Sequence, residues 1–236
     1  MRVNCRSRLC VVFAVLLLMA GCASVPPEPT VNLPPDHWRS ASEQKVAVVV
    51  AGKVQPQMHL PGASCLLCVG VAMAANKEVI EWVKGLDSSE LQELDEKIAD
   101  YLASFGVDAS RFALTELPLL EKSESPDYSA LENYGFTHAL VVDLDWVGLA
   151  RTYAQYIPRG TPYAGINGRI KYWNLATAEN LLSVPVEIHK PLTAQWKAQN
   201  FPEVTNAYYQ VVEEFKIKIV EVLNGSADPI ATATAE

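Results

Sequence analysis

The residues best suited to chemistry in this chain are two cysteines separated by two leucines, Cys65 and Cys68. A C-x-x-C pair is redox-active where a helix N-terminus lowers the pKa of one thiol, and it binds zinc where further ligands complete a set of four. His59 is the only histidine nearby, and there is no second cysteine pair. We therefore predict a local disulfide or packed thiols, keep a redox-active pair as the alternative, and expect no metal and no cofactor.

Other residue types that perform catalysis do not gather into a known pattern. Asp143 and Asp145 are two residues apart, so on a strand they would share a face. Paired carboxylates can do acid–base work, but we interpret these two as a solvent-facing strand face. The serines lack a G-x-S-x-G elbow, and the four histidines are scattered without ligand spacing: His37, His59, His138 and His189. The sequence predicts a protein that is not an enzyme.

Two segments have the composition of contact surfaces. Residues 149–164 carry tyrosines and arginines, which are enriched where proteins bind partners. The candidates are Arg151, Tyr153, Tyr156 and Tyr163. Residues 64–75 are apolar and uncharged, yet too short to cross a bilayer, which needs about 20 residues. We hypothesise that both segments contact a partner, while an ordinary hairpin loop and a buried helix are the simpler interpretations.

Strands and helices alternate along the part of the chain that would position these residues. Residues 46–50 are apolar on both faces, as in a strand buried between two layers. Residues 87–106 carry apolar side chains at helical spacing. Residues 112–117 are predicted to form a short strand, and residues 137–148 form another with Leu144 and Trp146 on one face.

The second half of the chain predicts a hairpin followed by a helix. Residues 163–174 and 182–188 both alternate between apolar and polar side chains, and Pro185 indicates that the second is an edge strand. Pro202 opens a final helix that ends near Asn224. The predicted fold is therefore α/β (α+β), a mixed sheet of about five strands in the order β-α-β-α-β-β-β-α, with helices packed on the sheet.

This order resembles a known envelope domain. The buried strand at residues 46–50, the helix ending at Gly106 and the stretch YGFTHALVVDLDWVG before an alternating hairpin are similar to the α/β domain of TolB (its N-terminal domain), the curli-secretion lipoprotein CsgG and the penicillin-binding-protein activator LpoB. His138 and Asp143 depart from the glycine- and aspartate-containing pattern of that group. The resemblance implies a fold over residues 45–224 and a non-enzymatic envelope role.

The N-terminus is typical of an exported protein. Three arginines precede an apolar run over residues 9–20, which fits a signal peptide. Ala20, Gly21 and Cys22 then resemble the lipobox of bacterial lipoproteins, although Met19 stands where leucine is usual. This resemblance implies cleavage before Cys22, acylation of Cys22, and, because Ala23 is not aspartate, location at the outer membrane facing the periplasm. In that oxidising compartment a disulfide is stable.

Composition and charge set the domain boundaries and the partners. We predict a signal peptide at residues 1–21, a proline-rich tether at 22–44, one domain at 45–225 and a disordered tail at 226–236. Removing the three leader arginines leaves 16 basic against 27 acidic residues, a formal charge of −11, which disfavours nucleic acid. The sequence therefore predicts a non-catalytic lipoprotein that is held to the membrane by its lipid anchor and binds an envelope protein or assembles into a homo-oligomer. The alternative is a periplasmic thiol-redox protein.

Overall fold

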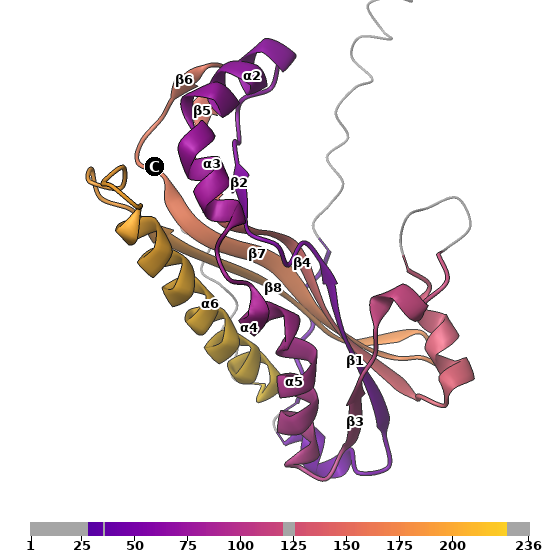
Figure 1. Cartoon of the computed structure of the whole chain (residues 1–236). Helices are drawn as coiled ribbons and strands as arrows, with labels where there is room; N and C mark the ends of the chain where they lie inside the picture. The colour runs from indigo at the N-terminus through magenta and orange to yellow at the C-terminus, as the bar shows by residue number, and fades with distance from the viewer. Residues whose placement is uncertain (1–27, 35, 120–125, 226–236) are drawn as a thin grey trace, which may run out of the picture.

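The computed structural model describes residues 28–34, 36–119 and 126–225, which build a long twisted sheet with helices on it (Figure 1). Its strands are β1 (Lys45–Gly52), β2 (Gln57–His59), β3 (Asp108–Arg111), β4 (His138–Ala150), β5 (Tyr153–Ala154), β6 (Ile157–Pro158), β7 (Tyr163–Asn174) and β8 (Glu179–Pro191). The α-helices are α2 (Leu66–Ala75), α3 (Lys77–Lys84), α4 (Ser89–Gln92), α5 (Leu94–Ala103) and α6 (Pro202–Leu223), and the 3₁₀ helices are η1 (His37–Ser40), η2 (Leu114–Glu116) and η3 (Tyr128–Tyr134).

The sheet is mixed, with strand order β3-β1-β4-β7-β8, and β2 continues the parallel edge beside the end of β4. β1 pairs in parallel with β3 and β4, whereas β4, β7 and β8 pair antiparallel. β5 and β6 form a separate small hairpin. The predicted α/β fold with a mixed sheet and packed helices is confirmed.

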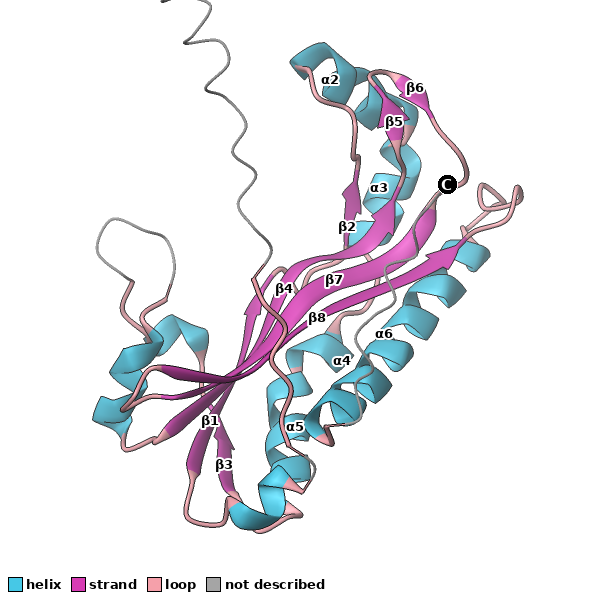
Figure 2. Cartoon of the chain, turned by 180° about the vertical axis from the view of Figure 1, so that it is seen from behind, coloured by secondary structure: helices cyan, strands magenta, loops and turns pink. Residues whose placement is uncertain are grey.

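The central strand β1 is buried on both faces, as its sequence predicts. Val46 and Val48 belong to the large core under the helices, while Ala47 and Val49 belong to a smaller core on the opposite face. α5 and α6 cover the first face, and η2 and η3 cover only the β1 end of the second. Seen from behind, no helix of the described residues covers the β7–β8 part of the second face (Figure 2).

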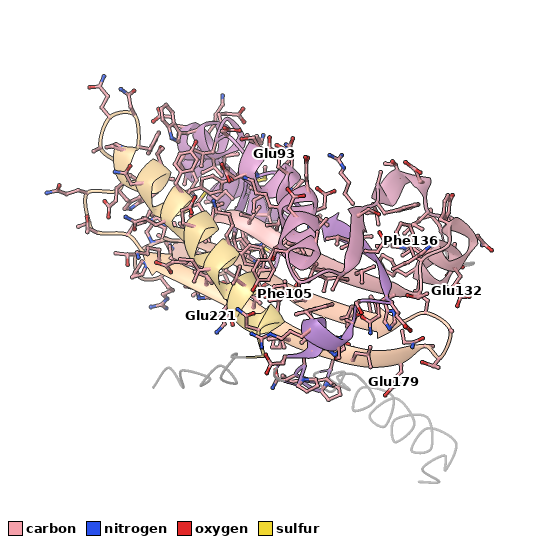
Figure 3. All side chains as sticks on the ribbon, turned by 90° about the horizontal axis from the view of Figure 1, so that it is seen from below. Glu93, Phe105, Glu132, Phe136, Glu179 and Glu221 are labelled. Carbon is pink, nitrogen blue, oxygen red and sulfur yellow. A yellow bond between two sulfur atoms is a disulfide. The ribbon has the colours of Figure 1, made fainter. Side chains whose placement is uncertain are left out.

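The end of the sheet beside η3 is closed by aromatic packing. The rings of Phe112 and Phe136 lie 5.8 Å apart, edge to face. The exposed carboxylates of Glu132 and Glu179 lie at this same end (Figure 3). α2 and the β5–β6 hairpin lie at the opposite end of the molecule.

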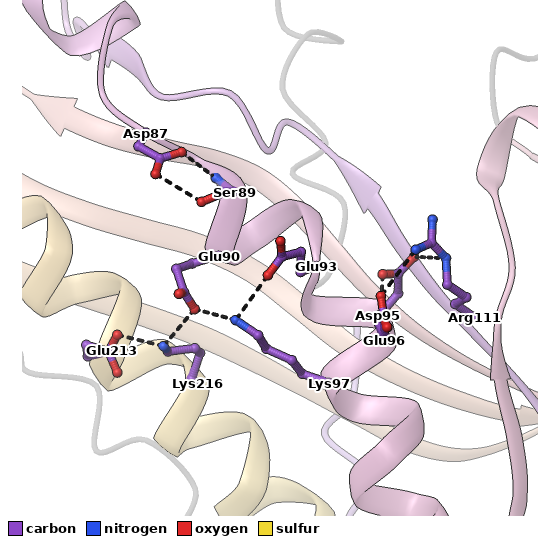
Figure 4. Close-up of polar contacts among 10 residues, drawn as sticks. All are labelled: Asp87, Ser89, Glu90, Glu93, Asp95, Glu96, Lys97, Arg111, Glu213 and Lys216. Atoms are coloured by element: carbon purple, nitrogen blue, oxygen red, sulfur yellow. Dashed lines mark hydrogen bonds and ion pairs between the residues drawn. The ribbon is translucent and has the colours of Figure 1, made fainter.

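Ionic contacts join α4 to α5 and to α6 (Figure 4). Glu90, on α4, accepts from Lys97 at 2.5 Å and from Lys216 of α6 at 3.1 Å. The hydrogen bond from Lys97, and after it the one from Lys216, lowers the pKa of Glu90. All three side chains are partly exposed to solvent, which screens their charges, so the cluster adds little stability. The predicted helix over residues 87–106 is interrupted at Glu93, so that α4 and α5 are separate.

The third strand lies earlier in the chain than its apolar residues suggest. β3 is formed by residues 108–111, mostly polar and exposed, and residues 112–117 are not a strand. Phe112 and Leu117 instead pack into the smaller core. The prediction of a strand at 112–117 is wrong because those apolar residues cover the sheet, while the preceding residues provide its edge.

A bulge in β4 reverses the faces of its second half. The register between β4 and β7 shifts between Leu144 and Trp146. Leu144 and Val147 therefore lie in the same core, and Trp146 points to the opposite face. The prediction that Leu144 and Trp146 share a face is wrong because one extra residue inverts a two-residue period.

Part of the predicted tether at 22–44 packs against the domain in the residues that the structure describes. Leu33, Trp38 and Ala41 are buried in the main core. Trp38 donates its indole N–H to the carbonyl of Leu223 at 2.7 Å. Val31 forms an antiparallel bridge with Ser183 of β8. β8 is the last strand of the sheet, so its predicted edge position is confirmed. The segment therefore joins the domain through a few widely spaced apolar residues.

Three predicted features lie outside the described residues: the signal peptide at 1–21, acylated Cys22 and the tail at 226–236. Within the described ranges, no helix has the length and hydrophobicity needed to cross a membrane.

Candidate functional site

The cysteine pair opens helix α2. Cys65 occupies the N-cap position, and its Sγ accepts a hydrogen bond from the backbone N–H of Cys68 at 3.0 Å. The two sulfurs are joined as a disulfide with Cα atoms 4.9 Å apart, within the usual range for such bonds. Cys65 is exposed and Cys68 is 5% exposed. The pair thus closes the first turn of the helix.

Helix α2 is apolar on its exposed side as well as its buried side. Leu66 is 95% exposed and Leu67 is 76% exposed, followed by Val71 and Met73 at 44% and 50%. Tyr156 and Ile157, in the β5–β6 hairpin at the same end, are 57% and 49% exposed. We call these six residues the apolar tip. Such a concentration of exposed large apolar side chains is typical of interaction sites.

A small separate core fixes α2 to the β5–β6 hairpin. Cys68 and Ala72 pack with Ala63 and Tyr153. The chain before the helix approaches the hairpin closely: Tyr153 donates its N–H to the carbonyl of Pro61 at 2.7 Å. Gly62 has a φ of +83°, and an added Cβ would overlap the carbonyl oxygen of Tyr153. Glycine is therefore required where the loop crosses the hairpin.

Asn76, between α2 and α3, is the polar residue that organises this end of the molecule. It is 2% exposed, and its amide nitrogen donates to the Tyr153 hydroxyl and to the carbonyl of Ala72, both at 2.6 Å. Its amide oxygen accepts from Arg151 at 3.0 Å. The Arg151 guanidinium lies 5.3 Å from the centre of the Trp196 ring. Asn76 was not predicted from the sequence, since one asparagine after an apolar run gives no distinctive signal.

The predicted contact residues of 149–164 therefore separate into two groups. Tyr153 is 4% exposed, so its side chain is not presented to a partner in this structure. Its ring and the half-buried Arg151 support α2 from beneath. Tyr156 is exposed at the hairpin, and Tyr163 is half-buried on β7, where burial raises its pKa. Only Tyr156 belongs to the apolar tip.

A shallow groove runs beside α2, between it, β2 and α3. Its volume is about 520 Å³, and Met58, Leu60, Val69 and Met73 contribute apolar walls. Lys84 is the only charged residue that lines it. The groove extends the apolar surface of α2 toward the sheet.

The histidines pack on aromatic rings in two places. His59 stacks on Trp146 with ring centres 5.5 Å apart, and His189 lies 4.5 Å from Tyr163. His138 stacks on Tyr172 at 5.3 Å, and His37 contacts the same ring edge to face. Burial lowers the pKa of His37 and of His138. In the described ranges, no three His, Cys, Asp or Glu side chains form a group that could hold a metal ion.

The two aspartates are not arranged as the alternation predicts. Asp145 lies in the β4 bulge and is exposed, while Asp143 is half-buried. Burial raises the pKa of Asp143, and the nearby Lys171 opposes that shift. Burial, with a smaller effect of the Asp143 charge, raises the pKa of Tyr128 to about 12.

Comparisons with known proteins identify no family. No family model matches the sequence, and no curated protein matches it. Similar solved structures include a DUF330 protein from Xanthomonas campestris, at 13% identity over 84% of this chain and 94% of that one, with a TM-score of 0.40. A hypothetical protein from Chlamydia trachomatis has 9% identity over 76% and 98%, with a TM-score of 0.34.

A neuraminyllactose-binding hemagglutinin homolog from Helicobacter pylori has 10% identity over 87% of this chain and 90% of that one, also with a TM-score of 0.34. No catalytic family is matched.

Proposed function

We propose that this chain is a non-catalytic lipoprotein that works by contact. Acylated Cys22 would hold it on the periplasmic side of the outer membrane, and the apolar tip would meet an envelope partner. The observation that carries the proposal is the exposure of Leu66 and Leu67 on a helix with no charged residue. A structural helix of a soluble domain would turn a polar face to solvent.

The residues that support α2 favour a contact function over a catalytic one. The buried Asn76, hydrogen-bonded to Tyr153 and Arg151, is used to fix the helix in place. The histidines contact aromatic rings, and Asp145 lies in a bulge. These groups therefore already have structural roles, and the most distinctive feature left at the surface is the apolar tip.

The anchor follows from the lipobox resemblance at residues 19–22 and agrees with the way the chain joins the domain. Glu28 lies 3.6 Å from Arg169 and 3.4 Å from Lys171, and the Ser183 hydroxyl donates to it at 3.2 Å. Five residues lie between Cys22 and Glu28, and the six residue steps span about 20 Å when fully extended. An acylated Cys22 would thus keep the domain close to the bilayer, and two or three acyl chains would make the attachment firm.

Membrane fractionation and site-specific crosslinking test the two parts of this proposal. Cys22→Ser should leave the outer-membrane fraction or remain unprocessed. A photoreactive residue at position 67 should yield a defined crosslinked product in the native envelope, while the same residue at the exposed Ile217 of α6 should not. Mature-sized Cys22→Ser protein in the outer membrane would refute the anchor, and equal crosslinking at both positions would refute the contact surface.

A thiol-redox function is the second candidate, and one observation favours it. Cys65 is exposed at the N-cap of α2 while Cys68 is buried in its first turn, and a helix N-terminus stabilises a thiolate. Insulin reduction by the reduced protein tests this candidate, with Cys65→Ser as the control. Turnover that is lost in Cys65→Ser would establish it, and turnover no greater than that of Cys65→Ser would exclude it.

A further inference from the structure

We propose that the apolar tip seats in the headgroup region of the bilayer that holds Cys22, giving the domain a second point of attachment. This inference rests on the proposed contact function and specifies its partner as a lipid surface. Leu66, Leu67 and Val71 would enter the boundary between headgroups and acyl chains, and the exposed Tyr156 would lie at headgroup level. Tyrosine suits that depth because its ring is apolar and its hydroxyl remains hydrated.

The shape and composition of α2 fit an interface better than a protein groove. A helix that docks in a groove shows one apolar stripe and a polar opposite face, but α2 exposes leucine, valine, methionine and alanine without a polar side. Helices that are apolar all round occur in protein interiors and in membranes. Ten residues extend only about 15 Å, so α2 reaches into one leaflet without crossing.

The backbone at the start of α2 also fits a headgroup layer. The first N–H groups of a helix have no partner within the helix. Cys65 Sγ accepts the N–H of Cys68, while Leu66 and Leu67 lie at the exposed start of the helix. Phosphate oxygens are good acceptors at a helix N-terminus. At the level of the phosphates, the free backbone N–H groups of the first turn would therefore find acceptors, whereas deep insertion would leave these groups without hydrogen bonds.

Charge is distributed so that this end of an acidic protein does not repel anionic lipid. The chain has a net charge of −8, yet residues 54–76 contain no charged side chain, and residues 146–164 contain two cations, Arg151 and Arg159, and no acid. Arg159 follows β6 and is exposed beside the hairpin. The exposed Glu132 and Glu179 lie at the opposite end (Figure 3). Electrostatic attraction would therefore orient the α2 end toward anionic headgroups.

The docked N-terminal segment places the apolar tip within reach of the same bilayer that holds Cys22. Val31 is fixed at Ser183, eight residues before the end of β8, so the α2 end lies about 26 Å or more farther along the sheet. The chain between Cys22 and Glu28 reaches about 20 Å. With both attachments engaged, the long axis of the domain would lie oblique to the membrane. A short tether gives the tip a high effective concentration at that surface.

Vesicles that reproduce the anchor test the inference directly. The chain from residue 22 onward contains every described residue, and with Cys65 and Cys68 bonded its only free thiol is Cys22. That thiol can be coupled to a maleimide lipid in vesicles of phosphatidylethanolamine and phosphatidylglycerol with brominated acyl chains. Leu66→Trp places a fluorescent reporter at the tip, and Ile217→Trp on α6 is the matched control, since both positions are exposed.

Bilayer contact predicts that bromine quenches the emission added by Leu66→Trp and leaves that of Ile217→Trp unchanged. Leu66→Ser together with Leu67→Ser should lower vesicle cosedimentation of the uncoupled chain by about tenfold or more. Quenching that is absent at position 66, or equal at both positions, would overturn the inference, including the case in which the tip binds a second copy. Because coupling is chemical, this result does not depend on whether cells acylate Cys22.

Discussion

The side-chain amide of Asn76 lies 2.6 Å from the hydroxyl of Tyr153, 77 residues farther along the chain. This contact joins the junction of α2 and α3 to the β5–β6 hairpin, so the exposed apolar helix is held on a buried polar group. Asn76 also binds the Arg151 guanidinium. The rigidity of the apolar tip therefore depends on a residue that is itself hidden from solvent.

Asn76→Leu should destabilise the protein by about 1–3 kcal/mol, because it leaves the Tyr153 hydroxyl and the Arg151 guanidinium without their partner. Urea unfolding measures the loss. Tyr153→Phe removes only one hydroxyl and should cost about 1 kcal/mol. The double variant should show coupling between the two changes; additive losses would contradict the contact.

Leu66→Ser and Leu67→Ser should change the free energy of unfolding by no more than about 0.5 kcal/mol each, since both side chains already face solvent. They should reduce the binding of a hydrophobic dye to the native protein. Leu91→Ala, at a fully buried position, should instead cost about 2–5 kcal/mol. Leucine-to-serine losses as large as that would place the tip inside the fold.

Gly62→Ala should destabilise α2 selectively, because a Cβ would overlap the Tyr153 carbonyl and φ is positive at this position. Hydrogen exchange should show faster opening of residues 66–75 with little change in β1 and β4. Gly70→Ala is a suitable control, since nothing lies near the added Cβ, and helix propensity favours alanine there. Protection of α2 that is the same in both variants would contradict the close approach.

Trp38→Phe should lower the free energy of unfolding by about 1–3 kcal/mol, because it removes the hydrogen bond to the Leu223 carbonyl and part of the buried ring. Thermal unfolding at neutral pH measures this effect. Arg39→Ala, beside it on the exposed side of η1, should stay within about 0.5 kcal/mol of the wild type. Equal stability of the Trp38 variant would mean that residues 36–41 do not dock in solution.

Stability should decrease as the pH falls below about 6.5. Burial lowers the pKa of His37 and His138, so in this range the unfolded chain binds protons that the folded chain does not. At pH values above 6.5 both states carry neutral imidazoles, so these two histidines no longer make the stability depend on pH. Urea midpoints between pH 7.5 and 5 should fall in the wild type and fall less in His37→Gln/His138→Gln. Parallel slopes would contradict the buried neutral histidines.

Much of the architecture could be predicted from the sequence because its signals are local. Apolar residues on both faces of β1, alternation in β7 and β8, and helical spacing in α5 and α6 report burial directly. The edge position of β8 also followed from one residue, Pro185. The candidate site was predicted only in part: the apolar composition of residues 64–75 was visible, but whether it was buried was not.

Tertiary structure decided the features that depend on distant partners. Burial of Tyr153 depends on Asn76 and Gly62, docking of Trp38 depends on Leu223, and the bulge at Asp145 redirects Trp146. None of these contacts leaves a periodic pattern, because each joins residues far apart in the chain or inserts a single residue. The sequence by itself determined an apolar, uncharged segment that carries two cysteines. Only the packing of the whole chain decided that its leucines face outward, because the sheet and the helices fill the core without them.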